Sequence, residues 1–274
     1  QAGLNLTTGT DNVFVGYNAC ANGTVTGDDN TVVGRSAGID LTSGYRNVLL
    51  GSGAGANVTD NHNNIAIGYN SLVSANTGEL YNVAIGSNAL SNEASGADYC
   101  IAIGYDALEG QNNDSINIGI GAAALQRNKT GSGNTALGYA AGYTTVSGTN
   151  SFVGHEAGRN TATASANVAV GYRAHKSSSF TDGTCDLNGT TTILCDSSGQ
   201  IAVGQSVTGD GIPHGSYVVT VNSAGSVTSF TIPEAATTTA NNVTLTFYQG
   251  TGDSNTCIGY KAGEDITTGY ENVL

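Results

Sequence analysis

Tryptophan and methionine are absent from the 274-residue chain, proline occurs twice, and only 8 residues are lysine or arginine. Against these cations stand 21 aspartates and glutamates, which gives a formal net charge of −13. So few cations argue against binding to nucleic acid or anionic lipid, because lysine and arginine supply the affinity for phosphate. No run of 18 or more apolar residues is present, so the sequence predicts no membrane-spanning helix. The expected partners therefore include neither nucleic acid nor a membrane into which the chain inserts.

Cysteine is also scarce, with five residues, no Cys-x-x-Cys pair and no histidine at zinc-binding spacing. Cys185 and Cys195 are close enough in sequence to form a local disulfide. Cys20, Cys100 and Cys257 stand where other copies of a repeat carry different residues, so we interpret them as small fillers of a packed interior. We expect no metal site and no cofactor.

Glycine is abundant, at 40 of 274 residues, which is about twice its ordinary share. Together with many threonines, serines and asparagines, this composition favours short strands and turns over helices. The first residue is Gln1 rather than methionine, and we expect the chain to be a segment of a longer array.

The main signal is a nine-residue pattern that recurs along the chain, for example NTALGYAAG at 134–142 and NTCIGYKAG at 255–263. When the copies are aligned on the position four before a glycine, ten of twelve positions are asparagine, and Cys100 and Ser115 are the exceptions. From Asn12 to Asn167 the mean period is near 17 residues, which fits one coil of a β-solenoid or β-roll.

Two columns of this alignment have clear structural roles. Asparagines at the same step of successive coils predict a hydrogen-bonded ladder, and the glycines predict tight turns with positive φ. The ladder residues are Asn12, Asn30, Asn47, Asn64, Asn82, Asn134, Asn150, Asn167 and Asn255. The turn glycines are Gly16, Gly34, Gly51, Gly68, Gly86, Gly104, Gly138, Gly154, Gly171 and Gly259.

The three residues before each turn glycine are nearly all apolar, as in Val13, Phe14 and Val15. Because successive side chains of a strand point to opposite faces, this pattern predicts that both faces are buried. One face would line the narrow interior of the coil, and the other needs a partner. A parallel homotrimer is the preferred solution, with a dimer or a lone two-layer solenoid as alternatives.

The repeat occupies residues 1–176 and resumes at 253–274, and a different segment lies between, at 177–252. It carries alternating β patterns such as SYVVTVN and VTLTFYQ, separated by turn signals. We expect a small inserted domain resembling a β-sandwich or barrel. A loop of this domain holds Asp210 and His214, with Tyr217 just beyond it, and these residues are the predicted contacts to a receptor.

The quoted repeats, with NVAIGSNAL and the LTTG arms, resemble those of bacteriophage tail-fibre shafts. They are also similar to the head repeats of trimeric autotransporter adhesins, and the inserted segment looks like a small β domain of phage virion proteins. The resemblance covers residues 1–175 and 253–274. It implies a trimeric, elongated, extracellular fibre and supplies no catalytic residue.

Several motifs can be interpreted either as catalytic or binding sites or as structural parts of the repeat, and we favour the structural interpretation for each. GRSAG at 34–38 matches a nucleophile elbow, but Ser36 lies in a repeat column rather than before a helix. The four histidines are expected on the solvated surface rather than at a metal. GDDN at 27–30 and GTGDSN at 250–255 lack the regular spacing of calcium-binding rolls. A column of tyrosines could stack on sugar rings, or each ring could cover the corner of the next coil.

The sequence thus predicts a non-enzymatic, structural and adhesive segment of a phage tail fibre, a spacer that displays a β domain for binding to a host-surface glycan or protein. A bacterial surface adhesin or an extracellular filament subunit is the alternative with the same mechanics. A glycan-degrading tailspike is the alternative from another class, but it needs a converging pair of carboxylates, and no such pair stands out. The expected location is a virion tail fibre or, alternatively, the bacterial surface.

Overall fold

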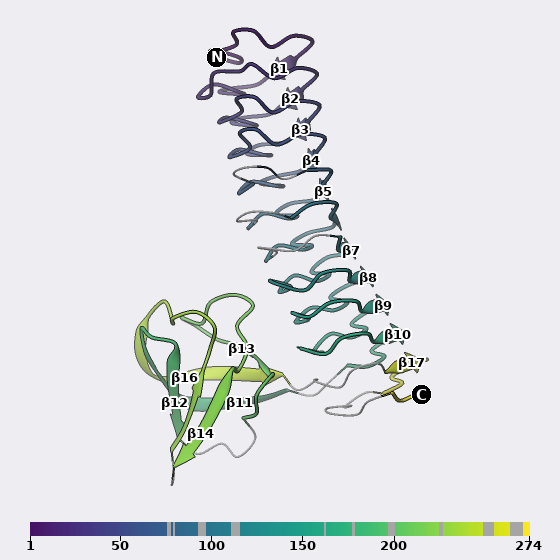
Figure 1. Ribbon diagram of the computed structural model, residues 1–274, viewed down its shortest axis with the longest axis vertical. Coiled ribbons are helices and arrows are strands. Elements are labelled where there is room, and N and C mark those ends of the chain that lie inside the picture. Colours follow the sequence, from purple (N-terminus) through teal and green to yellow (C-terminus); the bar gives the residue numbers. More distant parts are fainter. Residues whose placement is uncertain are drawn as a thin grey trace. The chain divides into compact units, whose positions relative to one another are not determined.

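A computed structural model describes residues 1–75, 78, 80–92, 97–110, 116–161, 163–176, 179–196, 201–224, 227–248, 255–263 and 271–274. Every regular element among them is a β-strand, and the chain divides into two compact units, Gln1–Ala141 and Gly142–Leu274 (Figure 1). Both units contain stacked coils with short parallel strands about 17 residues apart. The expected all-β solenoid is therefore confirmed.

In the first unit, eight strands of three residues each follow one another in sequence order and pair in parallel with their neighbours. Corresponding positions of adjacent coils face each other without offset, as in the pairing of Ile65 with Val83 and of Ile67 with Ile85. The strands are β1 (Val13–Val15), β2 (Thr31–Val33), β3 (Val48–Leu50), β4 (Ile65–Ile67), β5 (Val83–Ile85), β6 (Ile101–Ile103), β7 (Ile118–Ile120) and β8 (Thr135–Leu137).

The second unit contains three more coil strands of the same kind, β9 (Ser151–Val153), β10 (Val168–Val170) and β17 (Thr256–Ile258). β10 pairs in parallel with both β9 and β17, although 85 residues separate Val170 from Thr256 in the chain. The repeat therefore continues across the intervening segment without a change of register. Repeat arrays accommodate such insertions because each coil contacts only its neighbours.

The intervening segment forms one antiparallel sheet of six strands in the order β13-β16-β11-β12-β15-β14. All six described strands belong to this one sheet, and the expected sandwich-like or barrel-like arrangement stays a prediction. In Figure 1, β11 and β16 run across the direction of β12 and β14. The strands are β11 (Ser179–Asn188), β12 (Thr192–Asp196), β13 (Ser206–Thr208), β14 (Thr220–Ala224), β15 (Val227–Thr231) and β16 (Thr239–Tyr248).

The two kinds of sheet bury different side chains. In the coils after β1, the middle residue of each strand is buried, and it is often only alanine, as in Ala66 and Ala84, whereas Phe14 of β1 is half-buried. The inserted sheet has a conventional core, in which Phe230 and Phe247 lie edge to face at 5.3 Å among buried aliphatic residues. Most coils hold small or aliphatic residues inside, with the ring of Phe152 on β9 as a buried exception, whereas the core of the inserted sheet pairs two aromatic rings.

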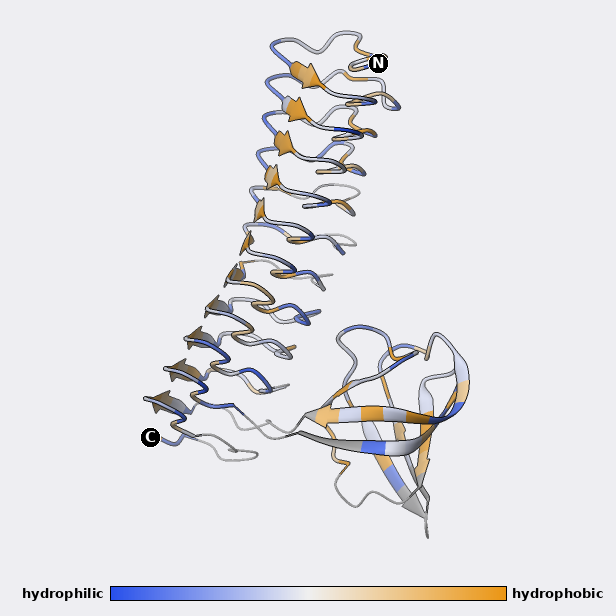
Figure 2. Ribbon diagram, turned by 180° about the vertical axis from the view of Figure 1, so that it is seen from behind, coloured by the Kyte–Doolittle hydropathy of each residue, from blue (hydrophilic) through white to orange (hydrophobic). Residues whose placement is uncertain are grey.

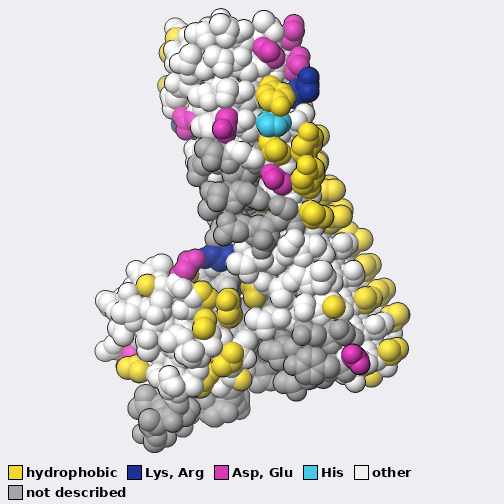
Figure 3. All heavy atoms as spheres, in the orientation of Figure 1, with side chains coloured by type: hydrophobic (Ala, Val, Ile, Leu, Met, Phe, Trp, Pro, Cys, Tyr) yellow, Lys and Arg dark blue, Asp and Glu magenta, His cyan; other side chains and the backbone are white. Residues whose placement is uncertain are grey.

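The prediction that both faces of each coil strand are buried is wrong for the single chain. The first and third residues of these strands remain partly exposed, at 54% for Val15 and 37% for Ile65. Figure 2 shows the coil strands as a row of hydrophobic segments, and Figure 3 shows hydrophobic side chains along the same side. The inward face is covered within each coil, and the outward face presents an aliphatic surface to solvent. We call this surface the aliphatic ladder.

Candidate functional site

The recurring chemistry of the coils begins with the asparagine ladder, which is present in both units. The backbone N–H of Asn64 donates to Oδ1 of Asn47 at 3.1 Å, and the N–H of Asn82 donates to Oδ1 of Asn64 at 2.9 Å. In the second unit the N–H of Asn255 donates to Oδ1 of Asn167 at 2.8 Å. These amides are buried, so each one satisfies backbone donors that water cannot reach.

One rung of this ladder differs from the alignment we made from the sequence. Ser115, which the alignment put at this position as an exception to asparagine, lies outside the described residues, and Asn117 occupies the rung. The N–H of Asn134 donates to Oδ1 of Asn117 at 2.9 Å. The corner of the same coil is Gly121, with φ 129°, while Gly119 lies inside β7. The sequence INIGIG offers two equivalent glycines two residues apart, and the alignment chose the wrong one.

The corner glycines are required for two physical reasons. Gly68 has φ 134°, a region that residues with a Cβ avoid, and the other predicted corner glycines lie between 131° and 147°. A Cβ on Gly68 would also stand 2.6 Å from the carbonyl oxygen of Gly86 in the next coil. Adjacent coils lie so close together at this corner that a side-chain methyl group would clash with the backbone of the next coil.

Each coil also contains residues with positive φ that are not glycine, and the sequence pattern did not reveal them. Leu72 and Leu90, for example, have φ 51° and are fully buried. Leucine rarely adopts this left-handed conformation. Both residues are held there by the next coil, because the Leu72 N–H donates to the Ala89 carbonyl and the Leu90 N–H to the Ala107 carbonyl, each at 3.0 Å.

The column directly after the corner glycine carries the tyrosines noted in the sequence. Their side chains are 37–74% exposed, so they cover the coil corners only in part. In the second unit His155, Tyr172 and Tyr260 stack on one another, with ring centroids 5.4 Å and 5.3 Å apart. A second aromatic row in the first unit includes Tyr81 and Tyr99, which are stacked at 5.2 Å.

Four residues of the second unit form a charge cluster that the sequence did not predict. The buried carboxylate of Glu156 binds Lys176 Nζ at 3.0 Å, Arg173 Nε at 2.6 Å and Arg159 Nη1. Burial alone would raise the pKa of Glu156, but hydrogen bonds from Lys176 and Arg173 and the nearby charge of Arg159 lower it to about 2. A carboxylate held ionised by three cations serves as a structural ion-pair centre and is a poor proton donor.

The expectation of surface histidines is wrong for His175. Its ring is fully buried at the coil position that holds Leu125 in the first unit, and neither ring nitrogen has a hydrogen-bond partner. Burial lowers the pKa of His175 to about 4. His62 and His155 are partly exposed or exposed and stack on Tyr45 and Tyr172.

The motifs that resemble a nucleophile elbow or a calcium-binding turn lie in turns of the repeat. Ser36 has φ 54°, and its N–H donates to the Tyr17 carbonyl in the preceding coil, which is a corner geometry rather than a nucleophile elbow. In the GDDN turn, Asp28 Oδ1 accepts hydrogen bonds from the Thr10 N–H and hydroxyl, and Asp29 pairs with Arg46 at 3.6 Å. Most of the GTGDSN turn lies outside the described residues.

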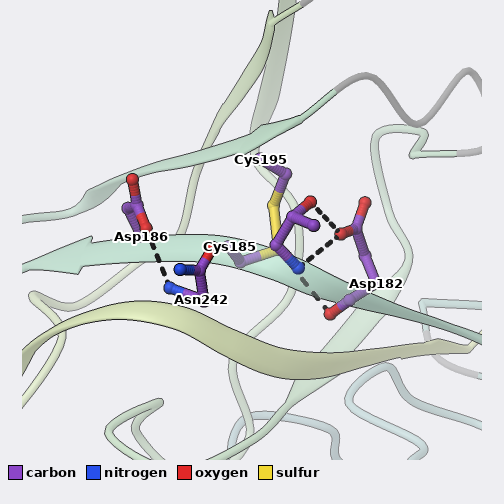
Figure 4. The surroundings of a disulfide bond; sticks show 6 residues. Asp182, Cys185, Asp186, Cys195 and Asn242 are labelled. Atoms are coloured by element: carbon purple, nitrogen blue, oxygen red, sulfur yellow. Dashed lines mark hydrogen bonds between the residues drawn. A yellow bond between two sulfur atoms is a disulfide. The ribbon is translucent and has the colours of Figure 1, made fainter.

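The inserted sheet contains the disulfide that the sequence suggested, between Cys185 and Cys195 (Figure 4). These residues stand directly opposite each other on β11 and β12. Asp182 lies close to both sulfurs, and its carboxylate accepts hydrogen bonds from the N–H and hydroxyl of Thr184 at 3.0 Å and 2.7 Å. Sulfurs joined in a disulfide are not thiolates, so this group is a weak candidate for metal binding. Cys20, Cys100 and Cys257 are buried and form no disulfide, in agreement with their interpretation as fillers.

The predicted receptor contacts lie at one turn of the inserted sheet. Asp210 is exposed, His214 is half-buried, and Tyr217 forms a bridge to Ser206 at the beginning of β13. The turn is closed by hydrogen bonds from the Ile212 N–H to the Gly209 carbonyl and from the Ser216 N–H to the Pro213 carbonyl. These contacts give the turn a defined shape, and its role in recognition stays a prediction.

Comparison of the chain with protein-family models, curated proteins and solved structures found no match. Among the described residues, no helix has the length and apolar character needed to cross a bilayer.

Proposed function

We propose that the chain is a structural and adhesive segment of an extracellular fibre, most closely a phage tail-fibre shaft, and that its coils associate as a parallel homotrimer. One observation carries this proposal, namely the aliphatic ladder that both units leave exposed. Side chains such as Val33, Ile120 and Val170 keep 37% of their surface in contact with water. Contiguous apolar surface of this kind is typical of sites of association.

The repetition itself supports a role as a spacer. The described coils share one pairing register and one corner glycine, and all but the coil of Cys100 carry an asparagine amide at the same position, so the array builds length rather than a pocket. The inserted sheet interrupts the repeat once and resembles a displayed domain. Its turn at 209–216 is the proposed contact to a host-surface glycan or protein.

A glycan-degrading activity is less well supported. Glycosidases use two carboxylates that face each other across a cleft. The most buried carboxylate, Glu156, is neutralised by three cations, and a carboxylate with a pKa of about 2 is unsuited to general acid catalysis near neutral pH.

Two substitutions on one coil test the association. Leu50 belongs to the aliphatic ladder on β3, and Ser52 is an exposed residue just beyond the corner of the same coil. Leu50→Lys is expected to reduce the assembled fraction in sedimentation velocity, because it places a charge in an apolar interface. Ser52→Lys introduces the same charge and is expected to leave the sedimentation profile unchanged. Equal profiles for Leu50→Lys and the unmodified chain would contradict the proposal.

A further inference from the structure

Three tyrosines of the first unit recur at every second coil. Tyr69, Tyr105 and Tyr139 follow the corner glycines of the coils of β4, β6 and β8. The two coils between them carry Ser87 and Ala122 at the same position. Because adjacent parallel strands lie ~4.8 Å apart, rings two coils apart are separated by ~9.6 Å. That spacing is about the length of two sugar rings in a linear polysaccharide.

Exposure shows that the small residues leave the rings of Tyr69 and Tyr105 uncovered. Tyr172 has His155 and Tyr260 stacked beside it in the adjacent coils and is 37% exposed. Tyr69 and Tyr105 are both 59% exposed. The difference indicates that small neighbours on both sides expose the ring faces, whereas aromatic neighbours on both sides cover them. An exposed ring face is the surface on which a sugar ring stacks.

Hydrogen-bonding groups lie beside the rings. The Asp106 carboxylate accepts a hydrogen bond from Asn88 Nδ2 at 3.1 Å and another from Gln126 Nε2 at 3.2 Å. The charge of Asp106 and its hydrogen bond to the Tyr105 hydroxyl raise the pKa of that tyrosine. Amide and carboxylate groups beside aromatic rings match the alternation of hydroxyl groups and apolar faces in a sugar.

We propose that Tyr69, Tyr105 and Tyr139 form a binding row for a linear, neutral polysaccharide that lies along the stacked coils. Each ring stacks on one sugar, and the intervening sugar lies over Ser87 or Ala122. The ligand is neutral because the chain carries a net charge of −13 and Asp106 stands at the row. This inference deepens the proposed adhesive function, because it names a ligand class and places its site on the solenoid rather than on the inserted sheet.

The row is distinct from the proposed interface between copies. Interfaces between protein chains have an apolar centre and a polar rim. The aliphatic ladder supplies the apolar centre, whereas the tyrosine row borders polar residues such as Asn70 and Asn88. The Ser52→Lys variant reports on this same column, and an unchanged sedimentation profile is the result expected for a column outside the interface.

Affinity electrophoresis of the intact chain in gels that contain dextran, mannan or galactan tests the row. We expect at least one of these neutral polysaccharides to retard the protein. Tyr69→Ala and Tyr105→Ala should each weaken the binding about fivefold to tenfold, because each removes one stacking ring. Tyr81→Ala removes an exposed ring of the other aromatic row and should leave retardation unchanged. Thermal unfolding of each variant verifies that the coils stay folded.

Ser87→Tyr is the sharper variant, because it adds an aromatic ring and removes none. The new ring would stand between Tyr69 and Tyr105 and cover their facing surfaces, as the neighbours of Tyr172 do in the second unit. Binding is expected to fall at least tenfold, although the number of tyrosines increases. Unchanged or stronger binding by Ser87→Tyr would show that the ring faces are not the ligand surface.

Two further results would overturn the proposal. The first is a wild-type chain that none of the three polysaccharides retards. The second is retardation that Tyr69→Ala and Tyr105→Ala leave unchanged, which would place the ligand elsewhere. Sedimentation separates these results from a failure of the proposed fibre. A chain that assembles without binding polysaccharide refutes the tyrosine row alone, and a monomeric chain that binds through the tyrosines refutes the assembly alone.

Discussion

The coils and the inserted sheet are both made of β-strands, but they obtain their stability in different ways. A coil strand has three residues and often contributes only an alanine to the interior. β11 and β16 have ten residues each, and the core of the inserted sheet contains two phenylalanines and a disulfide. The coils therefore depend on contacts between backbones, whereas the inserted sheet depends on side-chain burial and a cross-link.

The difference shows how a narrow repeat tolerates a weak hydrophobic core. Each coil donates backbone hydrogen bonds to the next. Buried asparagine side chains accept hydrogen bonds from backbone N–H groups that the short strands leave without a backbone partner. Close approach of the coils at Gly68 and its equivalents makes this possible, because a larger residue would separate the backbones.

Gly68→Ala should have the largest effect on stability. The added Cβ would stand 2.6 Å from the Gly86 carbonyl oxygen, and alanine disfavours φ 134°. We expect a loss of more than ~4 kcal/mol in the free energy of unfolding, measured by chemical denaturation. Gly78→Ala is the matched control, because Gly78 also has positive φ but no heavy atom within 4 Å of the added Cβ. Similar losses for both variants would show that contact between coils is not the cause.

The second unit should become less stable as the pH is lowered, because His175 is buried in its neutral form. Its pKa is about 4 in the folded chain and about 6.5 when unfolded, so the unfolded state binds a proton more readily between these values. Stability is therefore complete above pH ~6.5 and decreases by about 3 kcal/mol as the pH falls to 4. His175→Leu introduces the residue found at the same position in other coils and should flatten this profile. Glu156 affects stability in a lower pH range, because its stabilising contribution is lost as the pH falls from about 4.5 to about 2.

Chemical denaturation at pH values from 7 to 5 measures this effect, since most of the Glu156 contribution is retained in that range. Parallel profiles for the unmodified chain and His175→Leu would contradict the assignment to His175.

Removal of one rung should destabilise the coils by about 2–3 kcal/mol. Asn64→Ala removes the Oδ1 that accepts the Asn82 N–H at 2.9 Å, and this donor is buried away from water. Thermal unfolding measures the loss. Cys100→Asn is the reciprocal test, because Cys100 stands at a ladder position, and we expect it to preserve or slightly raise stability. A clear loss with Cys100→Asn would show that the ladder position does not favour an amide in that coil.

Reduction of the disulfide should have an effect similar in size to the loss of one rung and should be confined to the inserted sheet. Loss of the bond between Cys185 and Cys195 is expected to cost about 2–3 kcal/mol, since it closes a short loop. Hydrogen exchange with and without reductant should show faster exchange in β11 and β12 and no change in β3 to β5. Faster exchange in those coils would contradict the separate stabilisation of the two regions.

The sequence predicted the coils well because each column repeats one physical requirement. The asparagine at each rung and the glycine at each corner could be identified from their recurrence alone. The error at Ser115 arose where INIGIG offers two glycines, so that spacing could not choose between Gly119 and Gly121. The left-handed leucines, such as Leu72, left no signal, because leucine gives no local indication of positive φ.

The remaining features required three-dimensional information. Glu156, Arg173 and Lys176 come from two adjacent coils, and their meeting depends on side-chain direction rather than on any column rule. His175 was expected at the surface because histidine usually lies there, yet its column faces the interior. In the inserted sheet no residue recurs, so the pairing of β11 with β16 could not be inferred from the pattern.

The most direct test of the central claim is the mass of the intact chain in solution, measured by light scattering. The claim is that the aliphatic ladder, exposed in a single chain, is buried by association of copies. We predict a mass near three times the 27.5 kDa of one chain. A mass of 27.5 kDa at micromolar concentration would contradict the account, because the ladder would then remain exposed to water.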